Sequence, residues 1–353
     1  MAAVLPSSQF EADEKMFMVA AAADRDNSPA CGGEAAEETA LEDLPGDVLA
    51  LVLRRLDGAS LAALGCASSA FRSLAADPLA WRDLCLAAFP SSAAAPFSSC
   101  RSQSQHRALF ADAFPFPSSS PSPAPAAPAA AMAIPRRLVS AVDLWHGGKL
   151  IMSRVVETDA TSSWFLGSPF RIDALQQEGF TAPNPISPAE LSLTWVLLDP
   201  ATGRAVNASS RKPVAVDRSW LTGETVARFT LVFVTSGGEG DSMCAVEAAV
   251  ACDDRFGHVR EVSLSAEDGD GGGVSGRDAV ELVAAAMAAP RCRGGGVGVG
   301  AAVEEAKRRY GEFVKGKSAR KEWKARREGL VDLCCSGVGA AAFLGFILML
   351  TLR

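Results

Sequence analysis

The residues that come closest to a known chemical motif are Gly311 to Ser318, which read Gly-Glu-Phe-Val-Lys-Gly-Lys-Ser and match the phosphate-binding pattern G-x-x-x-x-G-K-[ST]. In that motif, backbone amides and the lysine hold the phosphates of a nucleotide, and the loop follows a buried strand and opens a helix. In this chain a charged, helix-like stretch precedes the motif and an apolar segment follows it. The context therefore argues against nucleotide binding.

Residues suited to acid–base, nucleophilic or metal chemistry are otherwise sparse. The chain has three His and nine Cys, with no Cys-x-x-Cys pair, and no His stands at metal-ligand spacing from a Cys or a carboxylate. No G-x-S-x-G motif is found. We therefore expect no catalytic residues, no metal and no cofactor, and interpret the chain as a non-enzymatic binding protein of a reducing compartment.

The net charge of the chain bears on which class of macromolecule it can bind. The 353 residues have a formal net charge of −7, whereas phosphate recognition needs Lys and Arg clustered on an accessible face. The one basic cluster lies directly before an apolar C-terminal segment. We therefore expect no nucleic-acid partner.

Composition divides the chain into six segments, and the predicted fold class is α+β. Leu-rich helical spacing marks one block, and short branched or aromatic runs between Gly, Pro, Asn and Asp clusters mark a β-rich block. The predicted segments are an acidic, disordered leader (1–40), a three-helix domain (41–89), an Ala/Pro/Ser-rich linker with a short helix near 107–114 (90–135), a β-rich sandwich or barrel-like domain (136–290), a Gly-rich loop with a basic charged helix (291–332) and a transmembrane helix (333–352).

Six runs within the β-rich block have the composition of strands. Gly147-Gly148 fits a tight turn between the first two of them. A helix is expected over Asp278 to Ala289. The predicted strands cover Leu138 to Leu144, Leu150 to Val156, Leu191 to Leu198, Ala227 to Val234, Ala245 to Ala251 and His258 to Leu264.

The helical block begins with Leu44-Pro45-Gly46-Asp47-Val48-Leu49, where Pro45 suits a first helical turn. Val48, Val52 and Leu56 recur every four residues, which predicts one helix with a broad apolar stripe. Asp57-Gly58 ends that helix. A block this small cannot enclose all of its Leu and Val side chains, so part of the stripe is expected to be covered by a partner.

These residues resemble the F-box family, a resemblance that covers about 45 residues. It rests on Leu-Pro-x-Asp-Val-Leu at 44–49, on Leu53-Arg-Arg-Leu56, on Cys66 five residues before Phe71, and on Asp77-Pro78-Leu79-Ala80-Trp81. The family usually has Trp where this chain has Phe71. The resemblance implies a substrate-receptor subunit of a Skp-cullin-F-box (SCF) ubiquitin ligase that binds a Skp-type adaptor and, through it, a cullin. The adaptor-binding residues that it implies are Leu44, Pro45, Val48, Leu49, Val52, Leu53, Leu56, Leu61 and Leu64.

Three stretches of the β-rich block are Ser140 to Lys149, Trp164 to Arg171 and Trp195 to Pro200. They are similar to the downstream region of a group of plant F-box proteins that often end in a hydrophobic anchor. This resemblance implies that 136–290 recognises an unknown protein substrate. Aromatic residues give a large contact area at low entropic cost, but they also fill β-domain cores. A binding protein for peptide or carbohydrate without a ligase role is the alternative. The candidate substrate-binding residues are Trp145, Trp164, Phe170, Trp195 and Trp220.

The uncharged run from Leu333 to Leu352 is long enough to cross a lipid bilayer, because 20 helical residues span roughly 30 Å. Seven Lys and Arg between 315 and 327 precede it, and only Arg353 follows. The excess of positive charge before the run keeps the rest of the chain on the cytosolic side. We therefore expect a single-pass C-terminal anchor at the cytosolic face of a membrane, with the endoplasmic reticulum and the nuclear envelope as candidates.

Overall fold

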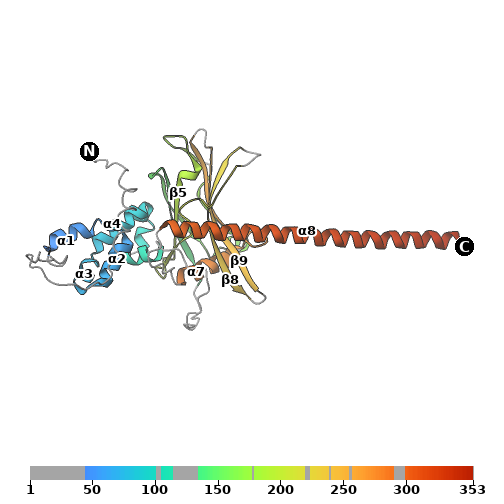
Figure 1. Ribbon diagram of the computed structural model, residues 1–353, viewed down its shortest axis with the longest axis horizontal. Coiled ribbons are helices and arrows are strands. Elements are labelled where there is room, and N and C mark those ends of the chain that lie inside the picture. Colours follow the sequence, from blue (N-terminus) through green and yellow to red (C-terminus); the bar gives the residue numbers. More distant parts are fainter. Residues whose placement is uncertain are drawn as a thin grey trace, which may run out of the picture. The chain divides into compact units, whose positions relative to one another are not determined.

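The computed structural model describes residues 44–100, 105–113, 134–176, 179–218, 223–237, 240–253, 257–289 and 299–352 (Figure 1). The predicted leader, 1–40, lies outside these residues. The chain forms two compact units, Met1–Asp77 and Pro78–Arg353.

The first unit contains three short helices with local capping. They are α1 (Gly46–Leu53), α2 (Gly58–Ala67) and α3 (Ser69–Leu74). The side chain of Asp57 accepts a hydrogen bond from the Ser60 amide at 2.7 Å and caps α2, and the Ser68 hydroxyl accepts one from the Ala70 amide at 3.2 Å and caps α3. A Cβ at Gly65 would lie 3.1 Å from the Ala75 Cβ, so the small residue allows α2 and the end of α3 to pack closely.

The fourth helix of this region belongs to the second unit. The structure has four α-helices over 46–88 where we predicted three, because Ser68 starts α3 separately and α4 (Pro78–Ala88) follows it. Helix α4 packs on α5 (His106–Ala113), with the rings of Trp81 and Phe110 in an edge-to-face contact at 5.6 Å.

Part of the segment that was predicted to be a linker is folded. The 3-10 helices η4 (Pro90–Ala93) and η5 (Ser98–Cys100) follow α4, and η4 contacts the first two strands of the β-rich region. Helix α5 is the short helix expected near 107–114, and its Leu109, Phe110 and Ala113 are buried. Residues 114–133 lie outside the described part of the chain.

The β-rich region consists of two antiparallel sheets. The four-stranded sheet has the order β2-β1-β5-β6, and the six-stranded sheet has the order β3-β10-β9-β8-β7, with β4 paired to β10. The strands of the first are β1 (Arg137–His146), β2 (Lys149–Asp159), β5 (Leu191–Leu198) and β6 (Ala205–Asn207); those of the second are β3 (Arg171–Leu175), β4 (Phe180–Thr181), β7 (Ala215–Arg218), β8 (Thr225–Gly237), β9 (Gly240–Asp253) and β10 (His258–Asp268).

The two sheets share one hydrophobic core. Trp195 and Leu144 from the smaller sheet join Phe229 and Leu264 from the larger sheet in this core. Two short elements lie between strands, α6 (Ser163–Gly167) and η7 (Pro188–Glu190), and helix α7 (Gly276–Ala288) follows the last strand. A Cβ at Gly276 would lie 2.0 Å from the Phe165 carbonyl oxygen, so only glycine allows α7 to approach α6 this closely.

The six predicted strands are present as β1, β2, β5, β8, β9 and β10, and the predicted turn is present between β1 and β2. Gly147 and Gly148 have φ values of 55° and 78°, and His146 pairs with Lys149. These left-handed conformations suit glycine and form a tight hairpin.

The C-terminal part of the chain is one helix, α8 (Val299–Thr351), where we predicted a charged helix and a separate apolar helix. Most of the Gly-rich loop predicted before it lies outside the described residues. The chain between the two predicted helices contains no proline, and Gly329 is tolerated within a helix. Phe313 of α8 is buried against Val232 of β8 and Ala245 of β9. The first part of α8 therefore packs on the larger sheet (Figure 1).

Candidate functional sites: an apolar helix face, a polar cleft and an apolar tail

Helix α1 and the residues just before it present an apolar face to solvent. Leu44 is 38% exposed, and Val48 and Val52 are both 42% exposed. Pro45 precedes the helix and is also exposed. Leu51 is 64% exposed and was not among the predicted residues, although its position three residues after Val48 places it on a neighbouring part of the helix surface. These five residues form what we call the α1 apolar face.

The other predicted adaptor-binding residues have a different environment. Leu49, Leu53 and Leu61 are buried, with 6%, 5% and 0% exposure, and Leu56 and Leu64 are half-buried. Side chains this inaccessible contribute to the hydrophobic core rather than to a free surface. The structure therefore divides the predicted set into a solvent-exposed group and a supporting buried group.

The predicted substrate-binding aromatic residues do not gather in one groove. Trp195 and Phe170 are 0% and 2% exposed and belong to the core between the sheets, as the alternative interpretation of these aromatics expects. Trp145 is half-buried at the end of β1, and Trp164 on α6 is 77% exposed. Trp220 lies outside the described residues. Of the described members, Trp164 is thus the one most accessible to a ligand.

A buried carboxylate attaches the segment after α4 to the β-rich region. Asp143 on β1 accepts hydrogen bonds from the amide and the hydroxyl of Ser91, at 2.9 and 2.7 Å, and from the hydroxyl of Ser153 at 2.7 Å. Burial raises the pKa of Asp143 above its usual value, and the hydrogen bonds from Ser153 and Ser91 offset part of that effect. The sequence did not indicate this contact between Ser91 and Asp143, because Ser91 lies in a segment with the composition of a linker.

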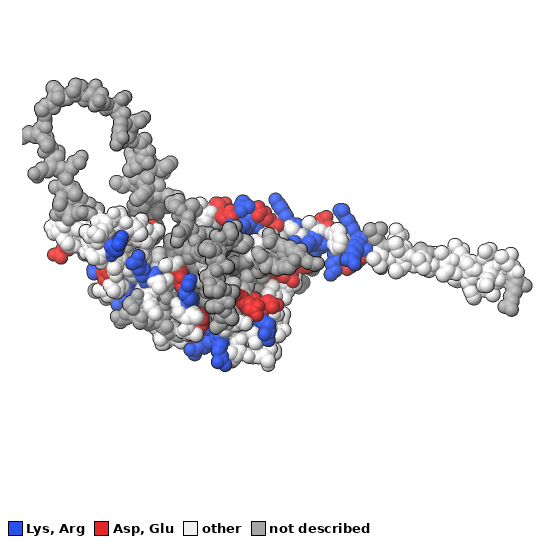
Figure 2. Space-filling model, turned by 90° about the horizontal axis from the view of Figure 1, so that it is seen from below, with Lys and Arg blue, Asp and Glu red and all other residues white. Residues whose placement is uncertain are grey.

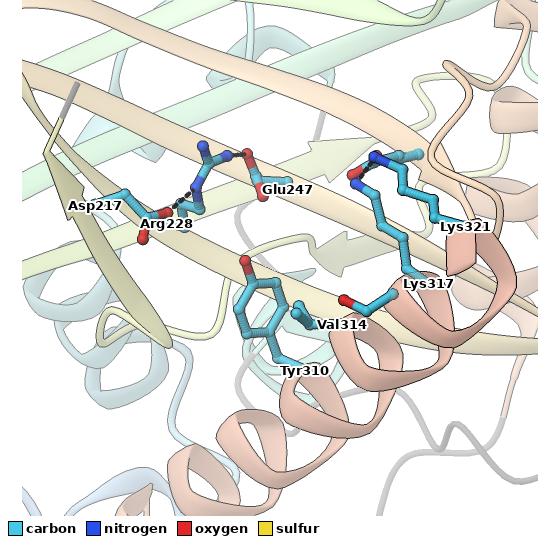
Figure 3. Close-up of a pocket in the computed structure, with 9 residues that line it drawn as sticks. Asp217, Arg228, Glu247, Tyr310, Val314, Lys317 and Lys321 are labelled. Atoms are coloured by element: carbon cyan, nitrogen blue, oxygen red, sulfur yellow. Dashed lines mark hydrogen bonds and ion pairs between the residues drawn. The ribbon is translucent and has the colours of Figure 1, made fainter. Parts of the chain in front are cut away.

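A polar cleft of about 440 Å³ lies between α8 and the larger sheet (Figure 3). In the cleft, Arg228 of β8 pairs with Asp217 of β7 at 2.7 Å and with Glu247 of β9. Lys317 of α8 pairs with Glu267 of β10. The remaining lining residues are Tyr310, Val314, Ser318 and Lys321, all from α8.

Burial shifts the pKa values of two groups in the cleft. Burial raises the pKa of Glu247, although the charge of Arg228 acts in the opposite direction. Burial also raises the pKa of Tyr310, the single tyrosine of the chain, and nearby Glu247 adds to this. The tyrosine hydroxyl therefore stays protonated at neutral pH and serves as a hydrogen-bond donor or acceptor.

The nucleotide-like motif has no loop in which to hold phosphates. Residues 311–318 form part of the uninterrupted helix α8, so their backbone amides take part in helical hydrogen bonds. Within the described ranges, no group of three His, Cys, Asp or Glu side chains is placed to hold a metal ion.

The last part of α8 is apolar and exposed. Among the described residues, α8 is the one helix long and apolar enough to cross a membrane, and its most apolar window has a mean hydropathy of 2.2 and is 0% buried. Figure 2 shows this part as a stretch without charged residues, directly after a group of Lys and Arg on the same helix. The support for a membrane span comes only from the length and the composition of this helix.

Comparison with known proteins identifies the family of the chain. A family model described as F-box-like matches residues 41–87. A probable F-box protein of Arabidopsis thaliana is 35% identical, with 84% of this chain and 88% of the relative covered, and a second F-box protein of that plant is 32% identical, with 84% and 86% covered. No solved structure matches. The matched segment contains the α1 apolar face, and the similarity extends over the β-rich region, so the chain belongs to the plant F-box family.

Proposed function

We propose that the chain is the substrate receptor of an SCF-type ubiquitin ligase. In this proposal the α1 apolar face binds a Skp-type adaptor, which in turn binds a cullin. The observation that carries it is the exposure of Val48, Leu51 and Val52 on one short helix within the F-box-like segment. Burying an apolar side chain stabilises a complex by about 1.5–3 kcal/mol when it starts fully exposed. Val48, Leu51 and Val52 start 42%, 64% and 42% exposed, so each contributes a corresponding part of that energy to an anchor.

The chain would act by proximity rather than by chemistry. F-box proteins are in general non-catalytic adaptor subunits, and no catalytic family matches this chain. A receptor that holds a target near a charged ubiquitin-conjugating enzyme raises the effective concentration of the acceptor lysine.

We assign substrate recognition to the β-rich region. Trp164 supports this assignment because an indole that is 77% exposed is an accessible anchor for a protein partner. The polar cleft beside α8 adds paired charges and the Tyr310 hydroxyl, which can fix the orientation of a bound peptide. The half-buried Trp145 is a second candidate contact.

We further assign the apolar part of α8, residues 333–352, to a lipid bilayer, with the F-box and the β-rich region on the cytosolic side. The support is the exposure of this stretch together with the basic residues before it and the single Arg after it. A receptor held in this way would direct ubiquitination to targets at a membrane surface.

Co-purification with a Skp-type adaptor tests the receptor assignment. The variant Val48→Asp plus Val52→Asp places two carboxylates on the α1 apolar face, and we expect adaptor binding to fall at least about 100-fold because each charge must be desolvated. Val216→Asp is the matched control, because Val216 is also 42% exposed but lies on β7. Unchanged binding of the double variant would contradict the receptor assignment and leave the alternative, a membrane-anchored binding protein.

Alkaline carbonate extraction tests the membrane assignment. The full chain should stay with the membrane pellet, and a chain truncated after Glu328 should be released. Equal release of both chains would show that 333–352 does not hold the protein in a bilayer.

A further inference from the structure

Between the sheet contact and the apolar stretch, α8 carries a short segment rich in exposed cationic and aromatic side chains. We call this segment the collar and define it as residues 321–327, Lys-Glu-Trp-Lys-Ala-Arg-Arg. Just before it, Arg320 donates a hydrogen bond to the Gly269 carbonyl oxygen at 2.8 Å and pairs with Asp270 at 3.1 Å. The collar therefore begins directly after a contact of α8 with the loop that follows β10.

The collar has an excess of positive charge. It contains four Lys and Arg and one acidic residue, Glu322, which lies 3.7 Å from Arg326. The longer stretch from 315 to 332 contains seven Lys and Arg against three Asp and Glu, in a chain with a net charge of −7. The positive charge is thus concentrated beside the apolar part of α8, as Figure 2 shows.

Trp323 adds the residue type that is enriched where a membrane meets water. Its side chain is 62% exposed, and the guanidinium of Arg327 lies 5.6 Å from the centre of its ring. A cation over an indole ring combines apolar area and positive charge on the same side of the helix. This combination fits the layer in which lipid headgroups and the first acyl carbons are mixed.

Along the helix, the collar lies just outside that layer. At 1.5 Å per residue, Arg327 lies about 9 Å and Trp323 about 15 Å along the axis from Leu333. A bilayer has a headgroup region of about 5–8 Å on each side of its hydrocarbon core. If 333–352 crosses the core along the bilayer normal, Arg327 lies just outside the headgroups and Trp323 about 7–10 Å beyond them, which is within about a Debye length of a charged membrane surface.

Resting on the membrane assignment of the proposed function, we propose that the collar is a binding surface for anionic phospholipid headgroups, so that the tail prefers anionic membranes. Lys321, Lys324, Arg326 and Arg327 attract the headgroup phosphates and carboxylates. The exposure of these side chains leaves them accessible to lipid. Basic residues next to a span gain from the negative potential of such a surface, which falls off within a Debye length.

The test uses the full chain in nanodiscs of mixed phosphatidylcholine and phosphatidylserine. After gentle detergent extraction, native mass spectrometry measures the lipids that stay bound. The wild-type chain should retain phosphatidylserine well above its bulk proportion, and this enrichment should fall with salt. The variant K321Q/K324Q/R326Q/R327Q should lose the enrichment by at least about tenfold, because each basic residue near the surface contributes about a fivefold preference.

The matched control is K149Q/K212Q/R218Q/R277Q, which removes the same charge from exposed positions outside α8. It should keep the enrichment. Bulk-proportion retention by the wild type, or equal enrichment in the two quadruple variants, would overturn the proposal. Incorporation of the full chain into purely phosphatidylcholine nanodiscs is measured in parallel, because failure there would reject the membrane assignment itself rather than the role of the collar.

Discussion

Ser91 donates two hydrogen bonds to the carboxylate of Asp143, one from its amide and one from its hydroxyl, across 52 positions of sequence. Asp143 lies on β1 and Ser91 lies on η4, the element that directly follows α4. The last helix of the F-box-like segment is therefore attached to the β-rich region by buried polar contacts instead of by a free linker.

Removal of this carboxylate should destabilise the second unit. Asp143→Ala leaves buried donors of Ser91 and Ser153 without an acceptor, and we expect the free energy of unfolding to fall by about 3 kcal/mol or more. Urea denaturation measures the change. Asp270→Ala is the control because the Asp270 side chain is 80% exposed, and equal effects of the two substitutions would refute the structural role of Asp143.

The stability of the protein should change with pH in the direction expected for a carboxyl group whose pKa is raised in the folded state. Because burial raises the pKa of Asp143 above 3.8, ionisation is less favourable in the folded state than in the unfolded state. The contribution of Asp143 to stability is therefore greatest below pH 3.8 and declines as the pH rises through the folded-state pKa. Urea curves from about pH 4 to about pH 7 should show the wild type losing stability relative to Asp143→Asn; the opposite trend would contradict this sign.

Docking of α8 on the larger sheet should depend on Phe313. The side chain is 2% exposed against Val232 and Ala245, so Phe313→Ala should cost about 3–5 kcal/mol in local stability. Hydrogen exchange of residues 301–320 reports this loss as faster amide exchange. Val314→Ala, at a neighbouring position that is 39% exposed, should leave exchange nearly unchanged.

Trp195 is buried and Trp164 is exposed, so substitutions of the two side chains should differ in their effect on stability. Trp195→Ala removes a ring that is 0% exposed and should lower the free energy of unfolding by about 3–5 kcal/mol. Trp164→Ala changes an exposed side chain and should change stability by less than about 0.5 kcal/mol. Thermal unfolding followed by circular dichroism compares the two variants, and a large loss with Trp164→Ala would show that this indole is structural.

Thiol reactivity should follow burial. Burial raises the pKa of the Cys244 thiol to about 12, with the nearby Asp268 and Glu267 charges as smaller causes. Cys66 is exposed. At neutral pH we expect iodoacetamide to alkylate Cys66 and to leave Cys244 unmodified until denaturant is added, as peptide mass spectrometry would detect. Rapid alkylation of native Cys244 would show that the core around β9 opens readily.

Regular local patterns in the sequence predicted the helical start at Pro45, the strands and the Gly147-Gly148 turn, because residue spacing and turn chemistry report directly on local structure. Burial was harder to predict. Leu49 and Val48 are adjacent apolar residues, yet one is buried and the other is exposed, which depends on packing that spacing alone does not specify. The short strands β3, β4, β6 and β7 were missed because two to five residues carry no clear period.

The contact between Ser91 and Asp143 and the polar cleft could not be predicted for a related reason. Asp143 and Ser91 meet only after the chain has folded, and the cleft combines Asp217, Arg228 and Tyr310 from three elements. Long-range pairing of this kind leaves no periodic signal in one sequence. The opposite error occurred in α8, which we predicted as two helices. A change from charged to apolar composition was interpreted there as a break in the backbone, although the helix is continuous.

Because α8 is continuous, the number of residues between two points on it gives their distance along the helix axis. Because a helix rises 1.5 Å per residue, the stretch from Arg320, which contacts Gly269, to Leu333 sets a standoff of about 20 Å between the β-rich region and the start of the apolar stretch. Insertion of helical turns at this point would lift the β-rich region by about 5.4 Å each, whereas a flexible tether would set no such spacing. In the membrane-bound receptor that we propose, the length of α8 therefore sets the height of the β-rich region above the bilayer.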